Sequence, residues 1–458
     1  MSLLSIYSKM PIWLQDLAVQ IYSYKIEYQR YGKDYRRMLA SLIESDKWTS
    51  EQIRLYKEAN LRRIITYAYE HTSFYKEWFD SHGVHPNDFQ RLEDLQKFPV
   101  LTKEDVRENW KKMVSDEYKK KDLIRYHTSG STGKALDFYW TKECLKHYWA
   151  CFERYKYRLN LDVQRKSKHI NFTGKIVVPL SQNKPPYWRF RRAQNQYMLN
   201  MQHITPEKIK DIVDFINDGN FVYFIGYPSI MNSLAETIRE AGLKITNPPK
   251  YIFPSAEKLY DFQKENISSV FHNVRFFEHY GFSENAGCAS KGPDGYYHED
   301  FEHGHLELID QIDLGDTVTG KLVATGFKNY GMPFIRYEIG DTATFAKENH
   351  NAAVIQDIEG RNGDYVVTPE GAKIMRFGYI FKETDTIKEC QIVQNCPGEI
   401  IIRMVPRKHY DASDTEAKMR QSIREWISPT INVVFEYVES IPRTSSGKFK
   451  AVISNLSN

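Results

Sequence analysis

The sequence has few cysteines: five in 458 residues, with no CxxC pair among them. Their odd number and scattered positions exclude a disulfide framework and the spacing of a zinc knuckle. We therefore expect reduced, buried thiols of an intracellular protein. The five are Cys144, Cys151, Cys288, Cys390 and Cys396.

Long apolar runs are also absent. No such run approaches the roughly 18 residues of a membrane-spanning helix, and the first residues lack the pattern of a signal peptide. These absences predict a cytoplasmic protein without a transmembrane segment. Leu14, Leu17 and Ile21 recur at helical spacing, which predicts a helix docked on the core. Peripheral membrane contact and a homodimer surface remain alternatives for this helix.

Charge of either sign is not in marked excess, because 63 Lys and Arg residues stand against 59 Asp and Glu. This balance predicts no nucleic-acid partner. The most basic stretch, "YWRFRRAQNQY" (187–197), mixes cations with aromatic residues. We expect a solvated loop or a lip that faces an anion there, rather than an RNA-binding surface.

The chain contains 41% hydrophobic and 14% aromatic residues, which are enough to form a large hydrophobic core. Its length predicts two or more domains. Residues 1 to about 90 have helical periodicity, with Ser50 as the expected N-cap of one helix and Thr102 as the cap of a later one.

From Tyr126 onward, strand-like and helical stretches alternate. "HINFTG" and "FVYFIGY" are typical of buried strands, and "SIMNSLAETIREAG" of a helix that ends at Gly242. Residues from about 297 to 360 predict a compact antiparallel β subdomain. We place a boundary near Arg361, with a small α+β domain behind it. The expected fold class is thus multi-domain α/β, with an N-terminal domain over 1–360 and a C-terminal domain over 361–458.

One loop concentrates small residues ahead of a lysine: "YHTSGSTGKALDF" (126–138). Glycines allow backbone N–H groups to approach phosphate oxygens, hydroxyls add donors, and lysine adds charge. The spacing fits neither a P-loop nor the glycine-rich loop of protein kinases. On composition alone, a flexible Ser/Gly linker remains open.

Four later stretches accompany this loop. "EHYGFSENAG" presents Tyr280 and Glu284, and "YEIGDTA" presents Asp341. "IEGRNGD" contains Arg361 and Asp364, and "IPRTSSGKFK" presents Lys448. Each stretch alone is weak evidence for a functional site, since carboxylates in turns and lysines near a chain end are usually only solvated. Their order and spacing together are hard to attribute to chance.

These stretches resemble the signature elements of the adenylate-forming superfamily, which includes acyl-CoA synthetases, adenylation domains and luciferases. The similarity is greatest to the phenylacetate–CoA ligase family, in its capsular-polysaccharide-associated (CapK-like) group. It covers about residue 60 to 458. "TSGSTGK", "YGFSE", "IRYEIGD", "GRNGD" and "PRTSSGK" carry the resemblance, and "FIGYPSIMNSLAE" and "FPSAE" add to it.

The resemblance implies a nucleotide site. Glu284 would be the partner of Mg2+, Asp341 would accept the ribose hydroxyls, Arg361 would contact the nucleotide, and Asp364 would lie at a hinge to a mobile C-terminal domain. The residues implied to bind ATP are Thr128, Ser129, Gly130, Ser131, Thr132, Gly133 and Lys134 at the β- and γ-phosphates, Tyr280 beside the adenine, Gly281 and Ser283 in the same turn, and Ser255, Ala256 and Glu257 at the border of the pocket.

Lys448 is the expected catalytic residue, with Glu284 and Thr128 beside it. A carboxylate that attacks the α-phosphate builds up negative charge, which a bridging lysine stabilises. Phe172, Thr173 and Gly174 correspond to positions that line the acyl pocket in the family, although an ordinary strand end is an equal alternative. "IVVPLSQNKPPYWRFRR" follows where phenylacetate-type members have a glycine-rich turn, which argues against phenylacetate itself.

Some members of this group carry a Cys/His zinc site close to the hinge. Cys288 and His298 could be its remnants, but "AAVIQDIEGR" contains no cysteine, so structural zinc is not expected. The sequence predicts a ligase that uses ATP and Mg2+ to activate a small carboxylic acid, with coenzyme A as the acceptor. An amine or hydroxyl acceptor in surface-polysaccharide assembly is one alternative. A non-catalytic nucleotide-binding homologue is another, which the presence of the expected site residues disfavours.

Overall fold

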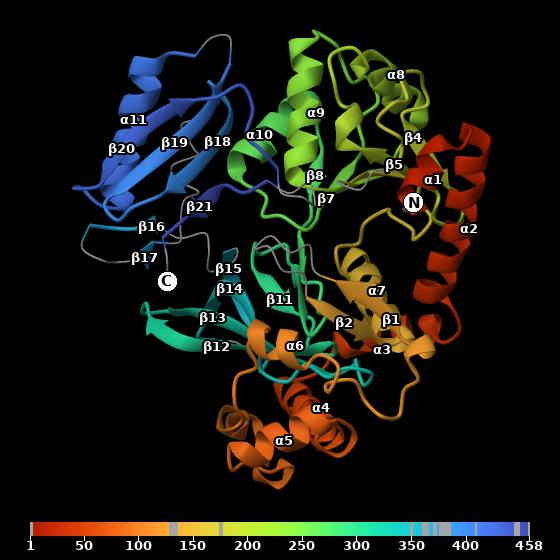
Figure 1. Ribbon diagram of the computed structural model, residues 1–458, viewed down its shortest axis with the longest axis vertical. Helices are drawn as coiled ribbons and strands as arrows, with labels where there is room; N and C mark the ends of the chain where they lie inside the picture. The colour runs from red at the N-terminus through yellow and green to blue at the C-terminus, as the bar shows by residue number, and fades with distance from the viewer. Residues whose placement is uncertain are drawn as a thin grey trace.

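The computed structural model describes residues 3–127, 136–173, 177–348, 351–359, 366–369, 373–374, 386–407, 410–443 and 449–456. Helices dominate its first hundred residues, and Figure 1 shows them along one flank and at the base of the molecule. They are α1 (Leu3–Lys9), α2 (Ile12–Tyr31), α3 (Tyr35–Ser45), α4 (Ser50–His71), α5 (Ser73–Ser81) and α6 (Lys103–Asn109). None of the described helices is long and apolar enough to cross a membrane.

Helix α4 begins one residue earlier than the sequence predicted. Thr49 is its N-cap, because the Gln52 N–H donates to the Thr49 hydroxyl at 3.3 Å and the Gln52 side chain accepts from the Thr49 N–H at 2.8 Å. This reciprocal pair needs Gln or Glu three residues after the cap, and Ser50 has Ile53 at that position. The predicted cap at Thr102 is confirmed.

Helix α2 packs against the protein as predicted, but the prediction that Leu17 and Ile21 make this contact is wrong, because their side chains are 51% and 66% exposed. The buried face carries Gln15, Ser23 and Ile26. Gln15 and Ser23 hydrogen-bond to Arg189 at 2.5 Å and to Gln194 at 2.8 Å. A buried arginine must find acceptors, and these fix the rotation of the helix.

A six-stranded, mostly parallel sheet forms the upper layer, with helices on its faces (Figure 1). The strand order is β4-β5-β3-β6-β7-β8. The predicted strands at 169–173 and 223–226 and the helix before Gly242 are confirmed. The elements are β3 (His169–Thr173), β4 (Trp188–Arg191), β5 (Gln196–Asn200), α8 (Ile209–Gly219), β6 (Tyr223–Gly226), α9 (Pro228–Glu240), β7 (Tyr251–Pro254), α10 (Asp261–Val270) and β8 (Arg275–Phe276).

The basic stretch 187–197 is not the solvated loop or anion-facing lip that we expected. It forms the antiparallel pair β4–β5, and Arg189 lies buried beneath α2. The Arg189 guanidinium donates to Gln15, Gln182 and the carbonyl of Pro186, so both of its terminal nitrogens are paired within the protein.

A second sheet has seven strands in the order β12-β13-β14-β15-β11-β10-β9. It packs with β1, β2, α4 and α5 around a large apolar core that includes Ile64, Phe79 and Phe334. Helix α7 lies between this sheet and the parallel sheet. The elements are β1 (Ile124–His127), β2 (Asp137–Trp140), α7 (Lys142–Arg158), β9 (His279–Gly281), β10 (Cys288–Lys291), β11 (Tyr297–Glu299), β12 (Gly304–Asp313), β13 (Thr317–Gly326), β14 (Tyr337–Ala346) and β15 (Val354–Glu359).

The C-terminal residues have a core of their own, in which Ile392 and Ile402 pack under Met419 and Ile423 of α11. In Figure 1 this part lies beside α9 and α10. Our proposed boundary at Arg361 falls outside the described residues. The elements are β16 (Val366–Val367), β17 (Lys373–Ile374), β18 (Ile387–Gln394), β19 (Glu399–Pro406), α11 (Ala412–Trp426), β20 (Asn432–Tyr437) and β21 (Val452–Ser454), with the sheet order β20-β19-β18-β21.

The cysteines are all free, and four of them are buried as predicted. Cys396 is the exception. It is exposed, since it lies in the turn between β18 and β19 rather than in a strand.

Arg154 on α7 is the most heavily paired buried cation in the described residues. Its side chain is fully buried and donates to Asp300 at 2.7 Å, to Glu302 at 2.5 Å and to the Leu42 carbonyl at 3.1 Å. Burial alone would raise the pKa of the Asp300 carboxyl, but the guanidinium holds it well below its usual range. This network joins α3, α7 and the segment between β11 and β12.

Replacing Arg154 with methionine should destabilise the fold strongly, because buried Glu302 loses its counter-charge and buried Asp300 loses the nearer of its two arginines. We expect a loss of about 3–5 kcal/mol in the free energy of unfolding, measured by urea denaturation. Lys210→Ala, which removes an exposed ion pair with Asp214, should change it by less than about 1 kcal/mol. Equal effects of the two variants would contradict this view of the network.

A second buried pair predicts how stability depends on pH. Lys57 donates to Glu299 at 2.6 Å; burial would raise the pKa of Glu299, but Lys57 and His305 lower it to about 2. A carboxyl with a depressed folded-state pKa stabilises the protein above its unfolded pKa of about 4.3, and this stabilisation is lost as pH falls toward 2. The urea midpoint of Glu299→Gln should therefore fall less between pH 6 and pH 3 than that of the wild type. A parallel fall in both proteins would show that Glu299 does not carry this effect.

Candidate active site

The carboxyl ends of the parallel strands gather several of the predicted site residues. The chain passes from β3 to β5 on one side and then to β6 on the other, so the end of β3 is a topological switch point, where ligands bind in open α/β sheets. Phe172 and Thr173 lie buried at this end. At Gly226, a Cβ would meet the Phe172 carbonyl oxygen at 2.1 Å. The Ser255 N–H donates to the Gly226 carbonyl at 2.9 Å, which brings the end of β7 alongside.

Glu257, two residues beyond Ser255, is anchored at the start of α9. Its carboxylate accepts from the backbone N–H and the hydroxyl of Ser229, both at 3.1 Å, where a helix N-terminus favours negative charge. It also accepts from the Phe449 N–H at 2.7 Å. Burial raises the pKa of Glu257, and these hydrogen bonds act in the opposite direction.

The contact from Phe449 was not foreseen from the sequence. Phe449 directly follows Lys448, and its N–H reaches a residue that the sequence placed at the border of the pocket. The C-terminal residues are therefore docked against the carboxyl edge of the parallel sheet. Only tertiary structure could have shown this contact, since the two residues are 192 positions apart.

Tyr280 and Asp341 are in direct contact, as the Tyr280 hydroxyl donates to Asp341 at 2.6 Å. Three strands separate β9 from β14 in the sheet order, so the sheet curves enough to bring them together. Close packing holds this turn: a Cβ on Gly281 would meet the Tyr148 hydroxyl of α7 at 2.9 Å.

Glu284 lies in the turn after β9 and is buried. The Tyr337 hydroxyl donates to its Oε1 at 2.5 Å, which orients the carboxylate. The next residue, Asn285, has a left-handed backbone with φ of 59°, and its amide donates to the Cys144 sulfur of α7 at 3.2 Å. Tyr337 lies within the motif "IRYEIGD", but the sequence alone assigned no role to its side chain.

Several predicted residues lie outside the described part of the chain. The strands before and after residues 128–134 pair antiparallel, with His127 of β1 opposite Asp137 of β2. The predicted residues outside the described part are Thr128, Ser129, Gly130, Ser131, Thr132, Gly133, Lys134, Gly174, Arg361, Asp364 and Lys448.

Cys288 and His298, named above as zinc-site remnants, do not face each other. On the paired strands β10 and β11, His298 stands opposite Ser290. Its ring contacts Asp294 at 2.8 Å and is partly exposed, whereas Cys288 is fully buried.

The fold is that of the multi-domain adenylate-forming ligases. The chain matches a 2-hydroxyisobutyryl-CoA ligase in its postadenylation state with a TM-score of 0.67 at 17% identity, over 87% of this chain and 88% of that one. The predicted fold class is confirmed.

Sequence relatives indicate an adenylate-forming enzyme and confirm the resemblance. Residues 366–455 match the CapK C-terminal domain. The chain is 27% identical to Protein CapK of Staphylococcus aureus, over 98% of this chain and 99% of that one. It is 26% identical to a phenylacetate-coenzyme A ligase of Thermus thermophilus, over 64% and 65% of the two chains.

The similarity also depends on the state of the neighbour. The same 2-hydroxyisobutyryl-CoA ligase in its thioesterification state, over 89% of this chain and 90% of that one, gives a TM-score of 0.54 at 19% identity. The fold of this chain therefore superposes better on that ligase in its postadenylation state.

Glu257→Gln should loosen the docking of the C-terminal residues, because a hydrogen bond to a charged acceptor contributes about 1.5–3 kcal/mol. We expect the amide of Phe449 to exchange with deuterium roughly tenfold to a hundredfold faster, measured by mass spectrometry of the peptide that covers 449–456. Glu240→Gln alters a more exposed contact, with Lys388, and serves as the matched control. Unchanged exchange in Glu257→Gln would show that this bond does not hold the segment.

Proposed function

We propose that the protein activates a small carboxylic acid with ATP and Mg2+ as an acyl-adenylate, and then transfers the acyl group to coenzyme A. The observation that carries this proposal is the Phe449–Glu257 contact. It docks the chain next to Lys448 on the edge of the sheet where Thr173, Gly226 and Ser255 converge. A catalytic lysine on a separate small domain needs such a docked arrangement to reach its substrate.

The nucleotide would lie between the turn after β9 and strand β14. Asp341 would accept the ribose hydroxyls, a task that suits a carboxylate, and the Tyr280 phenol that donates to it would stand at the adenine. Ser255, Ala256 and Glu257 would border the base. The loop Thr128–Lys134 would hold the β- and γ-phosphates, and Arg361 would contact the nucleotide from the C-terminal side.

Glu284 fits the metal. Tyr337 fixes its Oε1, and Mg2+ prefers hard carboxylate oxygens, so the Oε2 atom is the ligand we propose. A metal ion held by Glu284 would supply positive charge that stabilises the leaving pyrophosphate.

In the first step an oxygen of the substrate carboxylate attacks the α-phosphorus of ATP. The new P–O bond forms as the bond to the β-phosphate oxygen breaks, which yields acyl-adenylate and pyrophosphate. Lys448 would bridge the reacting oxygens and stabilise the charge of the transition state. Phe172, Thr173 and Gly174 would line the acyl pocket, and burial of Phe172 and Thr173 would exclude water from the adenylate.

In the second step the thiolate of coenzyme A attacks the acyl carbon. A thioester forms, the bond to AMP breaks, and the thiol proton leaves to solvent. The relatives support this acceptor, because a phenylacetate-coenzyme A ligase and a 2-hydroxyisobutyryl-CoA ligase are among them. Rotation of the C-terminal domain about Asp364 would open the site to the thiol.

The chain is similar to Protein CapK over nearly its whole length, and this similarity supports a second candidate acceptor of the acyl group. That acceptor is an amine or hydroxyl of a sugar or amino acid. Release of AMP separates the two acceptors. Thiol-dependent release supports coenzyme A, and release only with an amine or hydroxyl compound supports the second.

The first test is carboxylate-dependent exchange of labelled pyrophosphate into ATP across aryl acids, short and long fatty acids, amino acids and uronic acids. Exchange with one class of acid is expected, and Lys448→Ala should slow it by about two to three decades, or about 3–4 kcal/mol. Lys450→Ala changes a neighbouring lysine and should leave it unchanged. ATP binding by calorimetry should persist in both variants. A protein that binds no ATP would overturn the proposal.

A further inference from the structure

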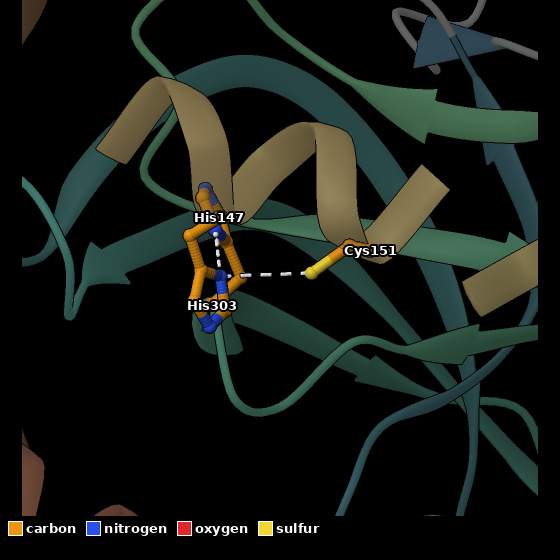
Figure 2. Close-up of side chains that lie close together, drawn as sticks. All are labelled: His147, Cys151 and His303. Carbon is orange, nitrogen blue, oxygen red and sulfur yellow. Dashed lines mark hydrogen bonds between the residues drawn. The ribbon is translucent and has the colours of Figure 1, made fainter. Parts of the chain in front are cut away.

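Helix α7 presents a second set of side chains, distinct from the residues of the proposed nucleotide site. Cys144, His147 and Cys151 are spaced at i, i+3 and i+7, so one face of the helix carries all three. His303, just before β12, meets this face. Figure 2 shows His147, Cys151 and His303 pointing toward one another, and all three are buried.

The separations within this cluster are those of ligands around one ion. The Nδ1 atoms of His147 and His303 are 3.0 Å apart, and the Cys151 sulfur lies 3.6 Å from the His147 Nδ1. All three ligand atoms lie within 4.8 Å of one another. A tetrahedral zinc ion with bonds of about 2.0 Å to nitrogen and 2.3 Å to sulfur places two nitrogens about 3.3 Å apart, and nitrogen and sulfur about 3.5 Å apart. The two histidine nitrogens would need to move apart by only about 0.3 Å, and the Cys151–His147 separation already fits.

The hydrogen bonds of His303 involve its Nε2 and leave its Nδ1 available to bind a metal. Its Nε2 lies 3.1 Å from both the backbone carbonyl and the side-chain oxygen of Asn285, two acceptors that require a proton on Nε2. The Nδ1 of the neutral ring therefore carries its lone pair toward His147 and Cys151. A metal-ligating histidine characteristically donates its other N–H to a carbonyl in this way.

The remaining two ligands are an imidazole and a thiol, and both side chains are buried. One cysteine sulfur and two imidazole nitrogens form a donor set that suits zinc.

We propose that His147 Nδ1, Cys151 Sγ and His303 Nδ1 bind one zinc ion with a structural role. The thiol of Cys288 on β10 hydrogen-bonds to the Cys151 sulfur and so lies beside the site. If the Cys151 thiol is protonated, zinc binding releases this proton to solvent, and no electron transfer occurs. None of the three principal ligands was singled out from the sequence, and His298 takes no part.

This ion would brace the turn that carries Glu284. His303 holds Asn285, the residue after Glu284, by two hydrogen bonds, and Asn285 has a left-handed backbone. Locking His303 to α7 through a metal therefore fixes this turn against the helix.

The test is metal content by plasma mass spectrometry, on full-length protein expressed in zinc-supplemented medium and purified without chelators or a histidine tag. The wild type should hold about one zinc per chain, and Cys151→Ser and His303→Gln should each lose roughly tenfold or more. Cys390→Ser, which alters a buried thiol in the C-terminal core, is the matched control and should keep the full content. The wild-type melting temperature should fall when a strong chelator removes the ion.

Cobalt replacement makes the outcome independent of whether the variants fold. Chelator-treated wild type should take up about one Co2+ and show the ultraviolet sulfur-to-cobalt charge-transfer band together with intense visible bands of a four-coordinate ion. The proposal is overturned if wild type holds no zinc and shows no such spectrum. It is equally overturned by a Cys151–Cys288 disulfide in peptide mapping, or by full metal content in a folded Cys151→Ser protein.

Discussion

The buried guanidinium of Arg154 is the constraint on which the centre of this molecule depends. It extends the polar stripe of α7, because Cys144, His147, Cys151 and Arg154 follow one another at spacings of three, four and three residues. A helix that buries polar groups must meet a partner for each, since an unpaired buried charge is costly. Asn285, His303, Cys288 and the pair Asp300 and Glu302 supply those partners. The helix and the curved sheet can therefore meet in only one register.

That register in turn fixes the proposed site. The turn from Gly281 to Asn285 is held on α7 at both ends, by the close approach of Tyr148 to Gly281 and by the contacts of Asn285 with Cys144 and His303. Glu284 thus obtains its position from groups that would touch no substrate. Tyr337 completes its orientation from β14, the strand that also presents Asp341. Supporting contacts of this kind give a site the precision that phosphoryl transfer requires.

Hydrophobic periodicity predicted β3, β6 and α9 because these elements bury apolar residues in a local, repeating pattern. It predicted the helix α2 but not the residues of its buried face, and it missed the strand pair β4–β5, for one shared reason. These elements bury polar groups against each other, as in the bonds from Arg189 to Gln15 and from Ser23 to Gln194 across about 170 residues of chain. Motifs identified Tyr280, Glu284 and Asp341. The contact between Tyr280 and Asp341, like that between Glu257 and Phe449, depends on sheet curvature and domain docking, which no local pattern encodes.

The chemistry of the docked surface suits the domain motion that we propose. Besides Phe449 and Glu257, the contacts include ion pairs of Arg407 with Glu236 at 2.7 Å and of Lys388 with Glu240 at 2.9 Å. Tyr260 and Phe262 add a small apolar patch against the C-terminal core. Polar groups that separate regain hydrogen bonds to water, so such a surface opens at a far lower free-energy cost than an apolar one of equal area. A large apolar interface would hold the lysine segment in place after adenylation, and the thiol could not enter. The ion pairs and hydrogen bonds between the described residues of the two parts therefore suit the alternating arrangements that we propose.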